Sequence, residues 1–387
     1  MKIQLNAADF SKQLDFAIKA VAKNGIIPEL ECFLLQADAH RVTITATNLE
    51  TQIRTECVAL CEGDFAAFSV TVIARTFCDA IKALGAQNIT LNFGGDKLEI
   101  VSKKGKYKMQ TEIGADFPIF DEIEDSFGFT VNCLQLEKAI ESVSFAVSKD
   151  EMRAAMCGVY VELDYTNDTV SFVATDAHRL AKFEMPTTYH HKDNGIEPFI
   201  IPAKGLKLAK SLIDKFKKLY EFNDNTDISL FYLGNAVQFG EEQDTVTVRL
   251  TDEKYPDCAS VVPKDVTTTV TVNRSELRES LRCVGIFADT DTNRVILNFD
   301  YDHLLLTTRD EMNGKEATHQ IACETGGEPL QIAFNATYLH EITGVFDGDE
   351  IHFSLTDARK AALIETVGGA ADEAFFVVLM PVMINVD

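Results

Sequence analysis

The stretch IQLNAADFSKQLDFAIKAV at residues 3–21 decides the fold, because its pattern occurs three times in the chain. The other two copies are FTVNCLQLEKAIESVSFAV at 129–147 and VTVNRSELRESLRCVGIFA at 270–288. Each copy reads as an alternating strand, a polar residue placed to cap a helix, and an amphipathic helix. A pattern that returns at long intervals indicates a repeat architecture rather than one large domain.

Further landmarks return in the same order. A second strand-and-helix pattern follows each copy, and a strand that ends in a Thr-rich turn lies between the two; these segments are 68–84, 198–213 and 330–345, and 43–50, 170–179 and 304–312. Thr47 and Thr175 are 128 residues apart, close to one third of the 387-residue chain. We therefore predict three repeated domains, at residues 1–127, 128–262 and 263–387.

The predicted fold class is α+β, with antiparallel sheets and two helices in each domain. Most of each repeat alternates polar and apolar residues with period two, as at 97–113 and 244–250, which is typical of half-buried antiparallel strands. Leu14, Ile18 and Val21 form one apolar stripe on the first helix, which must be buried on a sheet.

Composition excludes several classes of protein. The longest apolar stretch, 374–384, has 11 residues and contains a proline, so it is too short to cross a bilayer. The N-terminus does not resemble a signal peptide, and the nine cysteines form no CxxC pair, which favours free thiols and a cytoplasmic location. Sixty acidic and 36 basic residues give a net charge of -24, which on average repels nucleic acid.

Positive charge is nevertheless concentrated in the predicted helices. These helices, at 8–23, 74–84, 134–153, 203–218, 273–284 and 335–345, hold 17 basic and 11 acidic residues, so the rest of the chain carries -30. The densest helix, 203–218, has six lysines, and Lys204, Lys207 and Lys210 recur on one face. Such a stripe is suited to phosphate contacts without base readout, although lysines on an exposed helix also serve simply to solvate it.

Four segments resemble one known family, the bacterial DNA polymerase III β subunit, which is the replicative sliding clamp. They are RAAMCGVYVE (153–162), ATDAHRLA (174–181), YPDCASVVP (255–263) and VVLMPV (377–382), and the resemblance covers the whole chain. It implies three domains of one topology, two copies closed head to tail into a ring, helices lining the hole, and double-stranded DNA held topologically without sequence preference. Polymerase subunits and a clamp loader are the implied protein partners.

The resemblance also implies three sets of site residues. A cleft for partner peptides that carry a Gln and apolar anchors would be lined by Met156, Thr175, Ala177, His178, Arg179, Leu180, Pro256, Val261, Val378, Met380, Pro381 and Val382. His178 and Arg179 would hold polar ends of the peptide. Residues expected to face DNA are Lys12, Lys19, Lys23, Lys82, Lys149, Arg153, Lys204, Lys207, Lys210, Arg278 and Arg282. Contacts between the two copies are expected at Lys106, Tyr107, Met109, Ile286 and Phe287.

The chain departs from the family pattern in places that concern individual contacts. Ser260 stands where relatives often carry arginine, Ala154 and Ala155 stand where some carry aromatic residues, and residues 384–387 extend the tail. Without the resemblance, Met380 and Val382 would be interpreted as ordinary core.

Catalytic and metal sites are not expected. Asp176 and His178 with Cys157 superficially suggest a nucleophilic triad, but they lack the strand-elbow context that such a triad needs. His190, His191 and Asp193 lie in a polar stretch without a metal-binding spacing. There is no GxxxxGK[ST] motif, so any ATP-driven loading must come from another protein. We expect no bound cofactor and no enzyme activity. The alternative function is an acidic scaffold that assembles proteins without encircling DNA.

Overall fold

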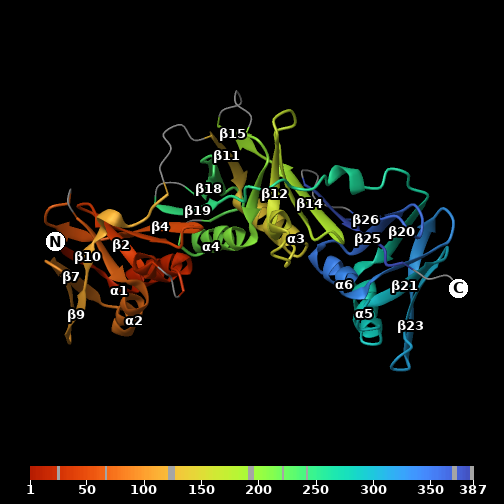
Figure 1. The fold of residues 1–387 in the computed structure, drawn as a ribbon, viewed down its shortest axis with the longest axis horizontal. Helices are drawn as coiled ribbons and strands as arrows, with labels where there is room; N and C mark the ends of the chain where they lie inside the picture. Colours follow the sequence, from red (N-terminus) through yellow and green to blue (C-terminus); the bar gives the residue numbers. More distant parts are fainter. Residues whose placement is uncertain are drawn as a thin grey trace. The chain divides into compact units, whose positions relative to one another are not determined.

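The computed structural model describes residues 1–23, 27–65, 68–120, 127–190, 196–219, 222–240, 243–367 and 373–383. The strand pairs within the described residues whose register is known are antiparallel, and helices pack on the sheets (Figure 1), so the predicted α+β class is confirmed. Contacts group the chain into two compact units. Unit 1 comprises Met1–Cys133, Tyr189–Asp193 and Lys204–Leu250, and unit 2 comprises Leu134–Thr188, Asn194–Ala203 and Thr251–Asp387. The three-domain boundaries near residues 127 and 262 stay a prediction.

Unit 1 is built on two sheets. The smaller sheet has the order β5 (Leu60–Glu62), β1 (Lys2–Asn6), β7 (Asn88–Gly94), β8 (Lys97–Val101), β9 (Lys106–Gln110). The larger sheet has the order β10 (Glu112–Ile113), β6 (Ser69–Ile73), β2 (Cys32–Ala37), β3 (Arg41–Thr47), β4 (Thr51–Val58), β19 (Asp244–Arg249), β18 (Ala236–Phe239), β17 (Asp227–Tyr232), β11 (Phe127–Asn132), β15 (Thr188–Tyr189).

Unit 2 is built on one long sheet. Its order is β16 (Phe199–Pro202), β12 (Gly158–Asp164), β13 (Thr169–Thr175), β14 (Arg179–Pro186), β27 (Ala374–Leu379), β26 (Ala362–Thr366), β25 (Glu350–Leu355), β20 (Thr268–Asn273), β23 (Lys315–Gly326), β22 (His303–Asp310), β21 (Arg294–Phe299), β24 (Leu330–Asn335).

Each α-helix follows directly on a strand, as the repeated pattern predicts. The helices are α1 (Ala7–Ala17), α2 (Ala74–Leu84), α3 (Cys133–Ser144), α4 (Ala203–Leu219), α5 (Arg274–Gly285) and α6 (Ala336–Val345). Short 3₁₀ turns occupy Ile18–Ala20, Pro28–Glu31, Gly114–Asp116, Ala154–Cys157 and Ala259–Val261.

The predicted polar caps are asparagines. The side chains of Asn6, Asn273 and Asn335 accept hydrogen bonds from the first backbone N–H groups of α1, α5 and α6. Because one kind of cap recurs directly after a strand, these three helices begin in the same local way.

The third helix is shorter than predicted. The sequence predicts that it reaches residue 153, but it ends at Ser144. Turn bonds from the Ala146 N–H to the Val143 carbonyl and from the Val147 N–H to the Ser144 carbonyl follow, and the Ser148 N–H then bonds the Met156 carbonyl. Lys149 and Arg153 therefore lie in a loop rather than on a helix.

The first helix is also shorter than predicted. It was expected to reach residue 23 but ends at Ala17, and a 3₁₀ turn that contains Lys19 follows it. Val21 comes next and is extended and buried, so the apolar stripe of the helix continues into the core without helical backbone.

The cores lie between helices and sheets. In unit 1, Phe10 of α1 and Phe77 of α2 are fully buried and meet edge to face, with ring centroids 5.7 Å apart. In unit 2, Phe375 of β27 contacts both Phe183 and Phe346. Each fully buried phenylalanine contributes about 1.5–3 kcal/mol by leaving water. Among the described residues, no helix combines the length and the apolar composition that a membrane span requires.

Sheets continue from one sequence repeat into the next at two junctions. In unit 1, β4 of the first repeat pairs with β19 of the second over Thr51–Thr55 and Asp244–Val248. In unit 2, β14 of the second repeat pairs with β27 of the third over Arg179–Glu184 and Ala374–Leu379. Both junctions are antiparallel. In each of them, the strand that follows the Thr-rich turn of one repeat pairs with the last strand of the next repeat.

The junction in unit 1 contains a buried ion pair. Lys215 of α4 and Asp244 of β19 bond each other, and their side chains are only 7% and 3% exposed. Thr55 of β4 donates to Asp244 and accepts from Lys215 at 2.7 Å, and the Lys215 ammonium lies 4.8 Å from the centre of the Phe16 ring. Burial lowers the pKa of Lys215, while the Asp244 carboxylate opposes that shift. This lysine therefore belongs to the core of unit 1 and not to the phosphate-facing stripe.

Removing one member of this pair should destabilise the fold. Lys215→Met leaves the Asp244 carboxylate buried without its cation, and we expect a loss of about 3–5 kcal/mol in the free energy of unfolding, measured by urea denaturation. Lys218→Met, which changes an exposed lysine on the same helix, is the control. A double change, Lys215→Met with Asp244→Leu, should recover part of the loss. Equal stability of Lys215→Met and Lys218→Met would contradict the structural role of the pair.

Candidate functional site

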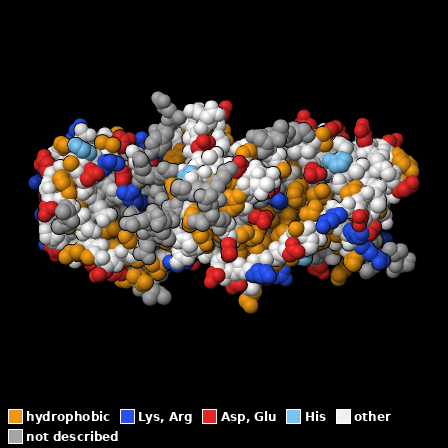
Figure 2. Space-filling model, turned by 90° about the horizontal axis from the view of Figure 1, so that it is seen from above, with side chains coloured by type: hydrophobic (Ala, Val, Ile, Leu, Met, Phe, Trp, Pro, Cys, Tyr) orange, Lys and Arg blue, Asp and Glu red, His pale blue; other side chains and the backbone are white. Residues whose placement is uncertain are grey.

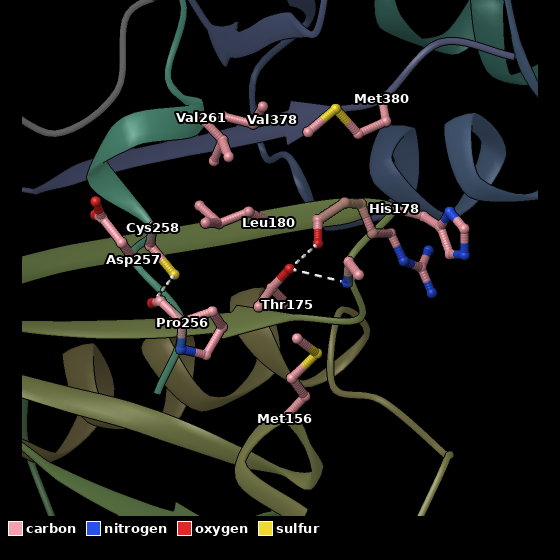
Figure 3. Close-up of a pocket in the computed structure, with 12 residues that line it drawn as sticks. Met156, Thr175, His178, Leu180, Pro256, Asp257, Cys258, Val261, Val378 and Met380 are labelled. Carbon is pink, nitrogen blue, oxygen red and sulfur yellow. Dashed lines mark hydrogen bonds between the residues drawn. The ribbon is translucent and has the colours of Figure 1, made fainter. Parts of the chain in front are cut away.

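A pocket in unit 2 gathers most residues of the predicted cleft (Figure 3). It encloses about 200 Å³, and we call it the unit 2 groove; it is lined by Met156, Thr175, Ala177, His178, Arg179, Leu180, Pro256, Asp257, Cys258, Val261, Val378 and Met380. The prediction did not include Asp257 and Cys258, although they lie inside the motif YPDCASVVP that indicated the site. Pro381 and Val382 do not line it, since the Val382 N–H turns to bond the Ala333 carbonyl of β24.

A tight turn after β13 forms one end of the groove. The Thr175 hydroxyl donates to the Arg179 carbonyl and accepts from the Ala177 N–H (Figure 3), while the Asp176 carboxylate accepts from the N–H groups of His178 and Arg179. These bonds hold Ala177 at φ 74°, a conformation that costs a non-glycine residue energy. Four hydrogen bonds therefore fix the groove wall in a rigid shape.

The floor of the groove is the junction between β14 and β27. Leu180 and Val378 are opposite each other in the two paired strands, and both are buried. Tyr255 packs in the same core and stacks on Tyr160 with ring centroids 4.9 Å apart. Its hydroxyl accepts from the Thr175 N–H and donates to a backbone carbonyl of β13, and burial raises its pKa. The floor is consequently apolar with its polar atoms satisfied.

Two methionines border the groove. Figure 3 shows Met380 and Met156 on opposite sides of the cavity, with Leu180 between them. Met380 is 37% exposed, and its N–H bonds the carbonyl of His178, whose ring packs against that of Tyr338. Methionine side chains are flexible and polarisable, so they can adapt to different apolar ligands. The arrangement suits an extended segment with apolar anchors.

The role expected of Arg179 is not compatible with its contacts. Its guanidinium pairs with Asp176 and Glu341, donates to the Phe145 carbonyl at 2.7 Å, and lies 4.4 Å from the centre of the Tyr338 ring. The side chain is 7% exposed. Arg179 therefore ties β14 to α6 inside unit 2 and is not free to hold the polar end of a peptide.

The residues that superficially suggested a catalytic triad have separate partners. Burial raises the pKa of Cys157, whose thiol contacts the Asp150 carbonyl, and raises the pKa of Cys258 in the groove to about 11. Neither thiol is a reactive thiolate near neutral pH. The Asp176 carboxylate is occupied by the turn and by Arg179, so it does not orient a histidine.

Of His190, His191 and Asp193, whose spacing does not predict a metal site, the structure describes only His190. His190 bonds the Thr130 hydroxyl and meets the Phe231 ring edge to face. His191 and Asp193 lie outside the described residues. The contacts of His190 are those of a side chain packed on β11 and β17.

The residues expected to face DNA are on the surface. All are exposed except Lys210, which is half-buried. Several share their charge with an acidic neighbour: Lys12 with Asp9, Lys82 with Asp15, Arg153 with Asp150, and Arg282 with Glu279. Figure 2 shows acidic side chains spread over the face that it displays. Among the described residues, no ion pair with a carboxylate involves Lys204 or Lys207, and the same holds for Lys19, Lys23, Lys149 and Arg278.

The residues expected at the contact between copies lie on an edge and at a helix end. β9 is the last strand of its sheet and pairs only with β8 among the described strands. Tyr107 on β9 is 49% exposed, and Met109 is half-buried. Ile286 and Phe287, directly after α5, are 69% and 40% exposed. Exposed apolar side chains beside an open strand edge mark a surface that needs a partner.

Comparisons with known proteins agree along the whole chain. Models of the DNA polymerase III beta subunit match in sequence order: the N-terminal domain at residues 1–121, the central domain at 130–257 and the C-terminal domain at 259–383. The beta sliding clamp of Vibrio cholerae is 26% identical over 384 residues, covering 99% of this chain and 100% of that protein.

Two crystal structures have the same fold. The DNA polymerase III subunit beta of Pseudomonas aeruginosa is 24% identical with a TM-score of 0.88, and the Bartonella birtlesii sliding clamp, bound to griselimycin, is 26% identical with a TM-score of 0.85. Each comparison covers 99% of this chain and 100% of the other. Since the three domain models together match nearly every residue, the chain belongs to the DNA polymerase III beta subunit family, the beta sliding clamps.

Proposed function

We propose that two copies of this sliding clamp close head to tail into a ring around duplex DNA, and that the unit 2 groove tethers polymerases and the clamp loader to it. One observation supports the ring most strongly. The junction between repeats occurs twice within the chain, and among the described strands it leaves two strands, β9 and β23, each with an edge that could form the same junction. β9 holds in the first repeat the place that β19 and β27 hold in the second and third. The stretch Lys315–Ala322 of β23 pairs only with β22 among the described strands.

The open edges of β9 and β23 are equivalent to the two strand edges that pair with each other at each internal junction. In β4 and β14, the strand that follows the Thr-rich turn pairs with the preceding strand on one side and with the next repeat on the other. β23 follows the corresponding turn of the third repeat, so its free side is the counterpart of those two. A second copy would supply β9 there, and Tyr107, Ile286 and Phe287 would be buried beside the new pair.

The repeats relate the residues of β23 and β9 to those of the internal junctions. Lys315 corresponds to Leu180, because each pairs with the residue that ends the preceding strand. Met109, Val248 and Leu379 correspond to one another. They pair with Leu98, Val237 and Ala362, which lie near the start of the preceding strand in the three repeats.

The register of the proposed pair follows from this correspondence. In the unit 2 junction, Leu180 pairs with the residue before Leu379. The equivalent pairing sets Lys315 against the residue before Met109. Two residues further along, since the strands are antiparallel, Ala317 would lie opposite Lys106 of the second copy.

DNA would be held by charge without sequence readout. Lys204 and Lys207 on α4 are cationic, exposed and outside the buried pair of Lys215. Contacts from lysine to phosphate are the same at every base pair, so they allow sliding. We infer a processivity factor without catalytic activity that acts in the cytoplasm.

The groove would bind short linear motifs of partner proteins. Its apolar floor, rigid turn and two methionines support an extended peptide with a Gln and apolar anchors, and the Bartonella birtlesii clamp is a relative with a bound ligand, griselimycin. An acidic scaffold without a ring is the alternative, and only ring closure separates the two.

The ring predicts a dimer with twice the 42.9 kDa chain mass in light scattering at micromolar concentration. Tyr107→Asp together with Phe287→Asp should give monomers, because two charges would be buried in an apolar contact. Val58→Asp, which changes an 82% exposed apolar residue away from both edges, is the control and should remain dimeric. A monomeric wild-type chain would refute the ring.

The lysine stripe predicts weak binding to linear duplex that falls with salt. Lys204→Glu with Lys207→Glu and Lys210→Glu should weaken it and make the salt dependence shallower by about one unit for each phosphate that is no longer neutralised. The control, with the same change in charge, reverses the exposed lysines Lys254, Lys264 and Lys360. Fluorescence anisotropy decides; sequence-selective, tight binding, or equal effects of both triple variants, would contradict the proposal.

The groove predicts a micromolar affinity for a QLxLF-type peptide, since one short motif buries little area. Met380→Ala removes an exposed anchor, and together with Leu180→Ala it should abolish binding in calorimetry while the dimer persists. Met312→Ala, a 91% exposed methionine outside the groove, is the control. Unchanged peptide affinity in the folded Met380→Ala and double variants would place the binding site elsewhere.

A further inference from the structure

Unit 1 contains a second pocket, which we call the unit 1 pocket. It encloses about 290 Å³ and is lined by Thr47, Leu49, Pro118, Ile119, Phe120, Leu233, Asn235, Ala236 and Arg249. It lies at the junction between β4 and β19, as the unit 2 groove lies at the junction between β14 and β27. The two cavities thus occupy equivalent places in successive repeats.

The turn that forms its wall repeats the turn of the groove bond for bond. The Thr47 hydroxyl donates to the Thr51 carbonyl and accepts from the Leu49 N–H, and the Asn48 side chain accepts from the next two N–H groups. Leu49 has φ 73°, against 74° for Ala177. A leucine held in this strained conformation, and 40% exposed, keeps an apolar side chain at the mouth of the pocket.

The chemistry of the two sites differs at one decisive position. The Arg249 N–H bonds the Glu50 carbonyl, as the Met380 N–H bonds that of His178, so Arg249 stands where the groove has a methionine. Its Nε donates to the Leu49 carbonyl at 3.1 Å, and its guanidinium lies 5.3 Å from the centre of the Phe120 ring. These two contacts orient the guanidinium at the pocket.

Arg249 has no carboxylate partner among the described residues, in a chain with a net charge of -24. It is exposed, while Leu49 and Ile119, which is 58% exposed, supply apolar surface beside it. A guanidinium with free N–H groups binds carboxylates through charge-assisted hydrogen bonds. The pocket therefore offers an apolar wall and an anion contact together.

We propose that the unit 1 pocket is a second docking site, which binds an extended segment of a partner protein that carries an apolar anchor next to an acidic residue. The unit 1 pocket has the same turn and the same kind of strand junction as the unit 2 groove, and this likeness favours an extended segment as its occupant. Arg249 would bind the carboxylate of that segment. This site would distinguish acidic motifs from the neutral motifs that fit the methionines of the groove. The proposal goes beyond the function proposed for the groove, and its test does not require peptide binding there.

The test uses two synthetic peptides that differ in one side chain. Acetyl-Gly-Leu-(4-fluoro-Phe)-Asp-Gly-amide carries the carboxylate, and the peptide with Asn in place of Asp lacks it; binding to the full-length protein is followed by fluorine NMR titration. We expect the Asp peptide to bind at least about fivefold more tightly. Arg249→Gln should remove this preference, and Arg359→Gln, which changes an exposed arginine outside the pocket, should keep it.

A second variant addresses the apolar wall. Leu49→Asn suits the positive φ at this position, so the fold is retained, and it should weaken both peptides by removing the apolar surface. Equal affinity of the two peptides for the wild-type protein would overturn the proposal. So would a preference for the Asp peptide that survives Arg249→Gln, or affinities that Leu49→Asn leaves unchanged.

Discussion

Antiparallel pairing of an open strand edge is the constraint on which the rest of this structure depends. An unpaired edge exposes a row of N–H and C=O groups, which need hydrogen-bond partners. The chain meets this need at two junctions by placing the last strand of one repeat against the strand that follows the Thr-rich turn of the repeat before it. Among the described strands, β9 pairs only with β8 and the start of β23 pairs only with β22, so each of these two strands keeps one open edge.

The two junctions share their backbone and differ in their side chains. In unit 1 the strands are accompanied by a buried pair, Lys215 with Asp244, that also bonds Thr55. In unit 2, near the start of β27, Lys138 of α3 is 39% exposed and pairs with Asp347 and Glu373. The same kind of strand junction is thus accompanied by a buried ion pair in unit 1 and by a partly exposed one in unit 2. The same divergence separates the methionine-lined groove from the arginine-lined pocket.

Local patterns in the sequence are sufficient to predict the helices and strands, whereas most of the groove residues are implied by the resemblance to the clamp family. Asparagine caps and alternating strands act over a few residues, so the starts of α1, α5 and α6 can be inferred from the letters alone. Long-range partners cannot be inferred in this way. In the sequence, nothing distinguishes Lys215 from its exposed neighbours, because its partner Thr55 is 160 residues away. Arg179 likewise resembles a ligand-binding residue in the sequence, because its partner Glu341 lies on the distant helix α6. The contact of the Ser148 N–H with the Met156 carbonyl, which follows the end of α3, is also not visible in the local pattern.

The pairing of β9 with β23 of a second copy is tested most directly by a disulfide in the inferred register. Lys106→Cys with Ala317→Cys places two cysteines opposite each other across the proposed pair, within the distance that a disulfide spans. Oxidation should then give a covalent dimer on a non-reducing gel. In the control, Lys106→Cys with Thr318→Cys, the second cysteine lies one residue away from the position opposite Lys106. Its side chain then points to the other face of the sheet, so this pair should cross-link poorly. Failure of the first pair to cross-link, or equal cross-linking of both, would contradict the account.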